Sequence, residues 1–155
     1  MTLPQITTNT LTALDGGANT GWAYWERYPM GWYLSACGLY RPLKDRRPPH
    51  VVIDCSAETV VVECPVYQKG DNPKRTNDLY KNTQRGCIVA GYLRPSVVHV
   101  VSPHEWKGGV PKDLQNQRTV DRLTVQELIV VDQLVGKLDD VLDAVGIGLV
   151  VTGRW

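Results

Sequence analysis

Four acidic residues lie within or directly after apolar runs, and together they could bind divalent metal ions. Asp15 and Glu63 each end a short apolar run, whereas Asp140 and Asp143 lie inside the apolar segment 138–149. A carboxylate beside a buried strand is costly to desolvate unless a positive charge compensates it. If the four acids converge in the fold, their oxygen atoms form a ligand set suited to Mg²⁺ or Mn²⁺.

The last of these segments has the pattern of a helix that carries both acids on one face. Its apolar residues recur at intervals of four, three and four, as in a helix packed on a core: Leu138, Leu142, Val145 and Leu149. Asp140 and Asp143 are three apart, so they project from one side of that helix together. Ala144 and Ile147 share this side, which is therefore not a solvated face. Because two acids near a helix start also gain from its dipole, this segment alone supports a structural and a functional role equally.

The other two acids also have structural alternatives. Asp15 precedes a glycine-rich turn, residues 16–21, whose backbone could approach a bound group closely. The same turn could be a simple hairpin in which the acid bonds its own backbone. Glu63 follows three valines and is harder to explain, although a Lys or Arg partner could satisfy it. Each acid is ambiguous alone, and the set is more informative than its members.

The elements that must position these acids are indicated by hydrophobic periodicity and by Gly and Pro punctuation. Strands are expected at 11–15, 21–27, 31–40, 59–63 and 97–101. Helices are expected at 78–93, at 111–123, from Thr124 through Leu134, and from Leu138 to about Val151. The third helix is marked by a capping box formed by Thr124 and Glu127. Residues 41–50 and 66–77 are expected to be loops, and residues 1–10 either a flexible arm or an edge strand. We expect residues 1–155 to form one domain, a mixed sheet covered by helices.

Composition restricts the class of protein further. The chain has 155 residues, 43% of them hydrophobic and 21% charged, which is typical of a globular domain. No apolar stretch is long enough to span a bilayer and no signal peptide is recognisable, so a cytoplasmic location is expected. The four cysteines lack C-x-x-C spacing, and the three histidines lack ligand spacing. We therefore expect reduced structural thiols and no zinc site.

The net charge of +1 does not by itself indicate a nucleic-acid partner, but the basic residues are clustered. One group comprises Lys69, Lys74, Arg75, Lys81 and Arg85, and a second comprises Lys107, Lys112, Arg118 and Arg122. Such stripes beside an acidic metal site could hold a polyanion whose phosphate meets the metals. Composition alone favours the simpler interpretation, a solvated face of mixed charge.

Taken together, the motifs resemble the RuvC family of Holliday-junction resolvases, within the RNase H-like and retroviral integrase superfamily. The segment 14–23, Leu-Asp-Gly-Gly-Ala-Asn-Thr-Gly-Trp-Ala, looks like the family's first-strand motif. Glu63 looks like its fourth-strand glutamate, and the segment 140–148 looks like its final-helix Asp-x-x-Asp-Ala motif. The order and approximate spacing match over residues 11–149. The resemblance implies an α/β fold, an RNase H-like mixed β-sheet of an antiparallel meander plus parallel strands, flanked by α-helices.

Two features of the sequence depart from the family pattern. Gly16 stands where the family usually has proline, which loosens the turn but leaves the acid in place. The aromatic residue that follows the family's glutamate corresponds best to Tyr67, one position later than expected.

Lys107 and Lys112 are similar in placement to the family's two DNA-contacting lysines.

The resemblance implies an activity, a cofactor and partners. Asp15, Glu63, Asp140 and Asp143 would hold two Mg²⁺ ions per active site, with Mn²⁺ as a substitute. Paired hydrolysis of a four-way DNA junction would leave 5′-phosphate and 3′-hydroxyl nicks. The DNA contacts would come from Tyr67, Lys69, Lys74, Arg75, Lys107 and Lys112. The compact size resembles phage-encoded members, whose site of action would be the host cytoplasm.

A homodimer is also implied, packed through the helix at 78–93, since a two-fold symmetric junction requires two sites. Gly86 and Ala90 would permit close approach of a second helix, although packing of these small residues on the sheet is an equal alternative. Three other functions compete with the resolvase: a nuclease for flaps or RNA–DNA hybrids, a non-catalytic DNA-binding protein, and a phosphate-binding member of the actin and sugar-kinase superfamily. The last ranks low, because the chain has one such module and no second domain to close over a nucleotide.

Overall fold

The strands of the protein form a mixed five-stranded sheet in the order β3-β2-β1-β4-β5. The computed structural model describes residues 3–42, 44, 47–53, 55–66, 70, 72–134 and 138–155. Its strands are β1 (Thr10–Asp15), β2 (Thr20–Tyr28), β3 (Gly31–Tyr40), β4 (Thr59–Glu63) and β5 (Val97–Val101). The pairs β1–β2 and β2–β3 are antiparallel, whereas β1–β4 and β4–β5 are parallel. This is the RNase H-like mixed sheet that was expected from the sequence.

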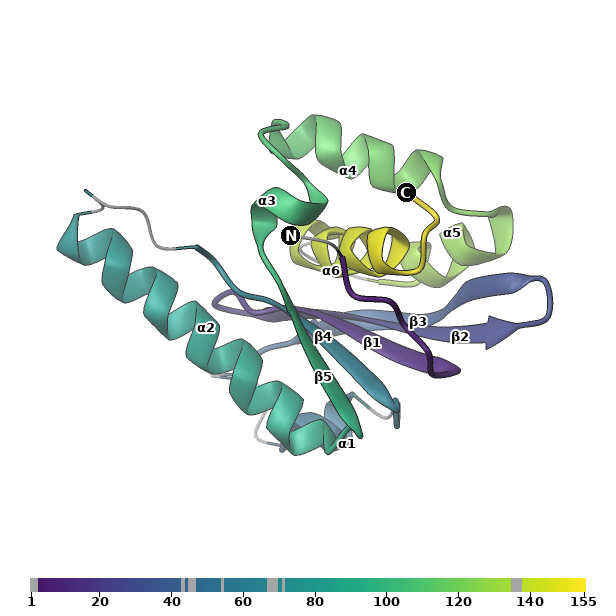
Figure 1. Ribbon diagram of the computed structural model, residues 1–155, viewed down its shortest axis with the longest axis horizontal. Helices are drawn as coiled ribbons and strands as arrows, with labels where there is room; N and C mark the ends of the chain where they lie inside the picture. The colour runs from purple at the N-terminus through teal and green to yellow at the C-terminus, as the bar shows by residue number, and fades with distance from the viewer. Residues whose placement is uncertain are drawn as a thin grey trace.

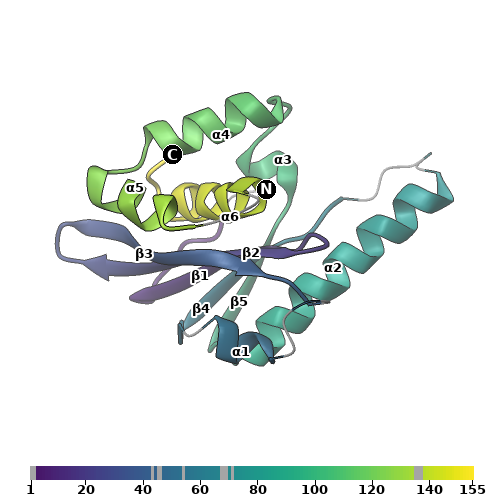
Figure 2. The same ribbon diagram turned by 180° about the vertical axis from the view of Figure 1, so that it is seen from behind.

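Helices cover both faces of this sheet, as Figures 1 and 2 show. They are α1 (Pro49–Val52), α2 (Pro73–Leu93), α3 (Pro103–Trp106), α4 (Lys112–Asp121), α5 (Val125–Asp132) and α6 (Leu138–Val151). α6 packs directly on one face, with α4 and α5 around it, and α2 packs on the opposite face with α1. Within the described residues, none of the helices combines the length and apolar character that crossing a bilayer requires.

The two faces of the sheet bury separate apolar clusters. β4 is buried at all five positions, as expected for a central strand without a polar face. Val61 belongs to the cluster beneath α6, whereas Val60 and Val62 belong to the cluster beneath α2. This alternation follows the two-residue period of a strand. It also places Glu63 on the face beneath α6, because Glu63 is two residues after Val61 in the same strand.

The strands begin and end within one residue of the expected positions. Two helices end two residues earlier than expected, α4 at Asp121 and α5 at Asp132, and three further differences concern α1, α2 and α3. α2 begins at Pro73, not at residue 78, since Asn72 caps it by accepting a hydrogen bond from the amide of Arg75 at 2.8 Å. Polar residues in its first turns conceal this start, so the expectation of a loop at 66–77 was wrong from Pro73 onward. Two one-turn helices, α1 and α3, were not anticipated because four residues carry too little periodicity to reveal a helix.

Gly86 and Ala90 of α2 face the sheet and are buried. A Cβ atom on Gly86 would lie 2.8 Å from Cγ1 of Val62 and 3.4 Å from the Cα of Gly16. Of the two alternatives for these small residues, packing on the sheet is therefore the correct one. The four cysteines are free: Cys37 is buried, Cys55 and Cys64 are partly buried, and Cys87 is exposed.

Glu127 and Arg154 form a buried ion pair that ties α5 and the C-terminus to β3. Glu127 is 2% exposed and accepts hydrogen bonds from both Arg154 and the backbone amide of Leu34. Arg154 also donates to the carbonyl oxygen of Trp32 at 3.0 Å. Burial acts to raise the pKa of Glu127, but the hydrogen bonds from Arg154, Leu34 and Thr124 outweigh it and lower that pKa.

We expect Arg154→Ala to destabilise the protein by about 3 kcal/mol, because it leaves the Glu127 carboxylate buried without its cation. Since the pKa of Glu127 is lowered by folding, its contribution to stability is present above the unfolded pKa and is lost as the pH falls through the folded value. Urea unfolding at pH 7 and pH 3 measures both effects. An equal loss at both pH values would contradict this role for the pair.

Candidate active site

Asp15 and Glu63 end two neighbouring parallel strands and lie side by side. They are register partners in the β1–β4 pair, so their Cα atoms face each other across the ladder. Asp15 lies on the same face of β1 as Ala13, and Glu63 lies on the same face of β4 as Val61. Ala13 and Val61 both belong to the apolar cluster beneath α6. The two carboxylates therefore project from the same edge toward α6. The convergence expected for these two strand-borne acids is confirmed.

α6 places the other two acids above this edge. Asp143 is 3% exposed, Asp140 is half-buried, and the intervening turn brings both toward the strands. The carbonyl oxygen of Asp140 lies against Gly21, the register partner of Asp15, and the charges of Asp143 and Asp140 both act to raise the pKa of Asp15. Asp139, by contrast, is exposed and accepts a hydrogen bond from Asn116 at 2.9 Å. Asp139, although adjacent to Asp140 in the sequence, therefore lies outside the cluster.

Close contact between α6 and β2 depends on Gly21, the register partner of Asp15. A Cβ atom at Gly21 would lie 1.9 Å from the carbonyl oxygen of Asp140, so no other residue fits without displacing the helix. Gly146 similarly accommodates the ring of Trp106, whose Cζ3 would lie 2.7 Å from an added Cβ. Gly21 and Gly146 thus determine how closely α6, with Asp140 and Asp143, approaches the strands that carry Asp15 and Glu63.

Trp106 is a site residue that the sequence did not reveal. It is 3% exposed, and its indole Nε1 donates a hydrogen bond to Oε2 of Glu63. Ser102 and Glu105 form a capping box that begins α3 and aims this tryptophan at the acids. The capping box of Ser102 and Glu105, directly before Trp106 and Lys107, is the sequence signal that could have indicated this short helix. The neighbouring His104, by contrast, is exposed.

On the four-way junction that the sequence resemblance implies as substrate, we expect Trp106→Phe to lower the cleavage rate about tenfold. We expect it to lower the stability by about 1 kcal/mol, because it removes one hydrogen bond to a buried carboxylate while preserving most of the aromatic packing. Single-turnover kinetics at saturating Mg²⁺, together with urea unfolding, measure the two effects. Trp32→Phe, which changes a buried tryptophan away from the acids, is the matched control. Equal rates for the two variants would contradict a positioning role for Trp106.

Two lysines reach into the acid cluster from the segment that carries α3 and α4. Lys107 Nζ lies 3.6 Å from Oε2 of Glu63 and 3.7 Å from Oδ2 of Asp143. It also stands 4.7 Å from the centroid of the Trp106 ring, within the range of a cation–π contact. Lys112 Nζ donates a hydrogen bond to Oδ2 of Asp143. Both lysines proposed as DNA contacts therefore lie against the acids.

The electrostatics of the cluster show an excess of negative charge. Burial, followed by the charges of Glu63 and Asp143, raises the pKa of Asp15 from 3.8 to about 8, although Lys107 opposes the shift. Burial also raises the pKa of Glu63, in spite of Lys107 and the hydrogen bond from Trp106. Burial acts to lower the pKa of Lys112, but its hydrogen bond and attraction to Asp143 raise it. Additional positive charge would therefore be favourable here.

The four acids have the oxygen donors that a hard divalent cation prefers, but their carboxylates lie too far apart to bind one as they stand. All four side chains offer carboxylate oxygens, and Oδ1 of Asp143 is buried without a hydrogen-bond partner. Within the described part of the chain, however, no three acidic, His or Cys side chains are gathered tightly enough to hold a metal ion as they stand. The Lys107 ammonium stands between Glu63 and Asp143, so a bound cation would take its place.

The remaining DNA-binding candidates are only partly described. Lys74 and Arg75 are exposed in the first turn of α2. Tyr67 and Lys69 lie outside the described residues. The structure therefore brings Lys107 and Lys112 to the acids and leaves Lys74 and Arg75 at the exposed start of α2.

A mixed sheet in the order β3-β2-β1-β4-β5 with helices on both faces is an RNase H-like fold. Solved structures with the same fold are Holliday-junction resolvases, as the sequence resemblance implied. The fowlpox virus resolvase, in complex with its substrate Holliday junction DNA, is 18% identical, with a TM-score of 0.57 over 93% of this chain and 97% of that one.

RuvC of Thermus thermophilus, also in complex with a Holliday junction substrate, has a TM-score of 0.50 at 12% identity over 90% of each chain. At these identities the similarity establishes the fold. No protein-family model matches the chain, and no curated protein matches its sequence.

Proposed function

We propose that the protein is a structure-selective endodeoxyribonuclease that resolves four-way DNA junctions by metal-dependent hydrolysis. The observation that carries this proposal is the register pairing of Asp15 with Glu63 beneath Asp143, in a fold shared with junction resolvases. Hydrolysis with paired nicks would leave 5′-phosphate and 3′-hydroxyl ends. Mg²⁺ is the proposed cofactor, two ions per site, and Mn²⁺ its substitute. When bound, the metal would supply an acidified water as nucleophile and positive charge at the leaving oxygen.

The residues of the chain prepare the site for that chemistry. Asp15, Glu63, Asp140 and Asp143 would hold the cations. Trp106 holds the Glu63 carboxylate in one orientation through its indole hydrogen bond. Glu63 and Asp143 are 9% and 3% exposed, so these two carboxylates have little contact with solvent.

The two lysines can act as mobile counter-ions. In the absence of a cation, Lys107 and Lys112 compensate part of the acid charge through Glu63 and Asp143. Lys112 has a side chain that is 45% exposed, so its ammonium can reach solvent and a DNA phosphate once a metal neutralises Asp143. Lys112 could therefore pair with Asp143 in the metal-free protein and contact DNA in the metal-bound protein.

We also propose a homodimer, formed through the exposed apolar face of α2 and β5. We define this face as Tyr80, Cys87, Gly91, Val98 and Val100. The three α2 residues are spaced by seven and four and so share one stripe. Tyr80, Val98 and Val100 are 54%, 52% and 59% exposed, and nothing lies within 4 Å of a Cβ added at Gly91. Apolar residues of this exposure along an edge strand favour burial against another chain.

Sedimentation of the variant Val100→Lys tests the dimer. We expect the wild type to sediment as a dimer and Val100→Lys to dissociate at least tenfold more readily, because a charge would be buried in the interface. Ile129→Lys is the matched control, since Ile129 is 53% exposed on α5, away from this face. A monomeric wild type would refute the dimer.

The activity is tested with a synthetic four-way junction, a linear duplex of the same sequence, a flap and an RNA–DNA hybrid, each with Mg²⁺ or EDTA. Paired nicks in the junction alone, absent in EDTA, would support the resolvase. Preferential cleavage of the flap or hybrid would favour the alternative nuclease. Junction binding without any cleavage would favour a non-catalytic DNA-binding protein.

A further inference from the structure

A pocket of about 350 Å³ opens beside α2, on the face of the sheet opposite α6. Its volume is within the range of small-ligand sites. Tyr40, the last residue of β3, forms part of its floor. Tyr40 pairs in register with Thr20, which directly precedes Gly21, the partner of Asp15. The pocket therefore lies at the same end of the sheet as the acids.

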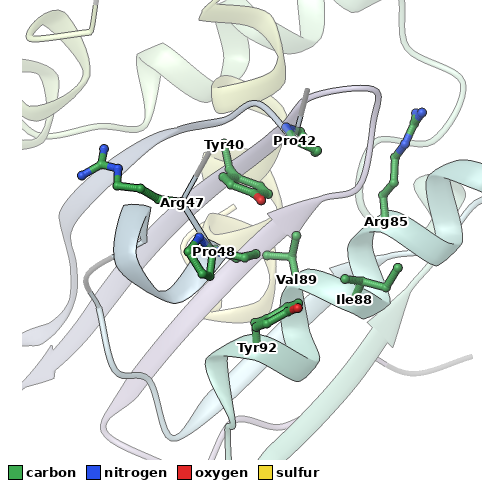
Figure 3. Close-up of a pocket in the computed structure, with 9 residues that line it drawn as sticks. Tyr40, Pro42, Arg47, Pro48, Arg85, Ile88, Val89 and Tyr92 are labelled. Carbon is green, nitrogen blue, oxygen red and sulfur yellow. The ribbon is translucent and has the colours of Figure 1, made fainter. Parts of the chain in front are cut away.

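The pocket combines aromatic and apolar walls with two arginines. Tyr40, Tyr92, Ile88 and Val89 line it together with prolines of the preceding loop. Figure 3 shows the guanidinium groups of Arg47 and Arg85 extending to opposite sides of these rings.

Its charge is positive and uncompensated within the described part of the chain. None of the described residues that line the pocket is acidic. Neither Arg47 nor Arg85 makes an ion pair with a described residue. An apolar ligand with anionic groups on two sides therefore complements the pocket better than a neutral or cationic ligand.

We infer that this pocket receives one unstacked nucleotide of a DNA strand. The base would pack against Tyr92 and Ile88, since aromatic side chains stack on bases of any sequence. The two phosphates that flank this nucleotide would bind Arg47 and Arg85, one on each side. A nucleic-acid strand has this alternation of a flat apolar group between two anions. The inference rests on the proposed function, because it assumes a DNA substrate.

The pocket lies close to the turn that follows Asp15, because Arg85, which lines the pocket, precedes a residue that packs against Gly16. Arg85 directly precedes Gly86, whose Cα would lie 3.1 Å from a Cβ added at Gly16. The backbone of α2 is thus in contact with the glycine turn, and a strand could run from the acids across this turn into the pocket. A nucleotide held there would fix the register of the strand relative to the acids.

Fluorescence anisotropy with three probes, all in EDTA, tests the inference. The probes are a labelled four-way junction, a short single strand of thymidine nucleotides and its abasic counterpart of equal charge. For the double variant Arg47→Ala with Arg85→Ala, we expect at least tenfold weaker junction binding and a salt slope reduced by about two. For Tyr92→Ala, we expect loss of the preference for thymidine over abasic strand. Arg27→Ala, at the opposite end of the sheet, should change every affinity less than twofold.

The outcomes separate this inference from the proposed function. If the wild type cuts junctions and the pocket variants bind all three probes as tightly as it does, the pocket inference is overturned and the nuclease stands. If the wild type binds through the pocket but cuts nothing, the nuclease fails and the pocket stands. If the variants lose affinity only because they no longer dimerise in sedimentation, the pocket is a protein interface and the inference is overturned.

Discussion

Asparagine in place of Asp15 should reduce cleavage of a four-way junction at least about a thousandfold and leave junction binding within about threefold of the wild type. In the proposed mechanism the amide would remove one anionic metal ligand at the centre of the cluster, and the metal charge that Asp15 would help to hold is worth on the order of several kcal/mol in the transition state. Single-turnover cleavage and anisotropy in EDTA measure the two properties separately.

The same substitution should make the metal-free protein more stable at alkaline pH. The pKa of Asp15 rises from 3.8 to about 8 on folding, so the folded state retains a proton that the unfolded chain loses. The stability associated with that proton is fully present below pH 4 and is lost as the pH rises toward 8. Because asparagine does not ionise, the variant should gain on the order of a few kcal/mol over the wild type at pH 8. Urea unfolding in EDTA at pH 5 and pH 8 measures the difference.

Asp139→Asn is the matched control, since it removes an equal charge from an exposed residue beside the cluster. This variant should cut junctions at close to the wild-type rate and show no gain in stability between pH 5 and pH 8. An Asp15→Asn protein that still cuts, or that is no more stable than the wild type at pH 8, would show that Asp15 is not part of a crowded acid site.

The strand-borne half of the site could be predicted from sequence because its causes are local. A run of β-branched residues predicts a buried strand, and a two-residue period fixes the face of its last residue. Glu63 was therefore placed correctly by the three valines before it. Asp143 was placed by the helical spacing of its apolar neighbours.

The side chains that contact the acids, Trp106 and Lys107, could not be predicted from the sequence, because their positions depend on tertiary packing. Trp106 bonds Glu63 across 43 positions of sequence. Lys107 reaches both Glu63 and Asp143 because α3 begins where β5 ends, and a one-turn helix leaves almost no periodic signal. The small residues of α2 illustrate the same limit. The sequence marks Gly86 as a site of close approach, but the packing decides that the sheet approaches it.

Gly21→Ala should destabilise the protein by at least about 3 kcal/mol and disrupt the site that it supports. An added Cβ would lie 1.9 Å from the carbonyl oxygen of Asp140 and 2.4 Å from its carbonyl carbon, and both belong to backbone that cannot rotate away. Overpacking of this kind forces the backbone to shift. For a chain of this size, the loss corresponds to a fall in Tm of about 6–12 °C. Thermal unfolding measures it.

The functional consequence of Gly21→Ala exceeds its cost in stability. A helix that moves away from β2 carries Asp140 and Asp143 away from Asp15, and a displacement near 1 Å can reduce a rate about a hundredfold. Cleavage at 10 °C, corrected for the folded fraction, separates the two effects. Gly109→Ala is the control, because nothing lies within 4 Å of its added Cβ. If the corrected Gly21→Ala rate equals that of the control, this glycine serves packing alone; a corrected rate far below it means that the distance between strand and helix sets the geometry of the acids.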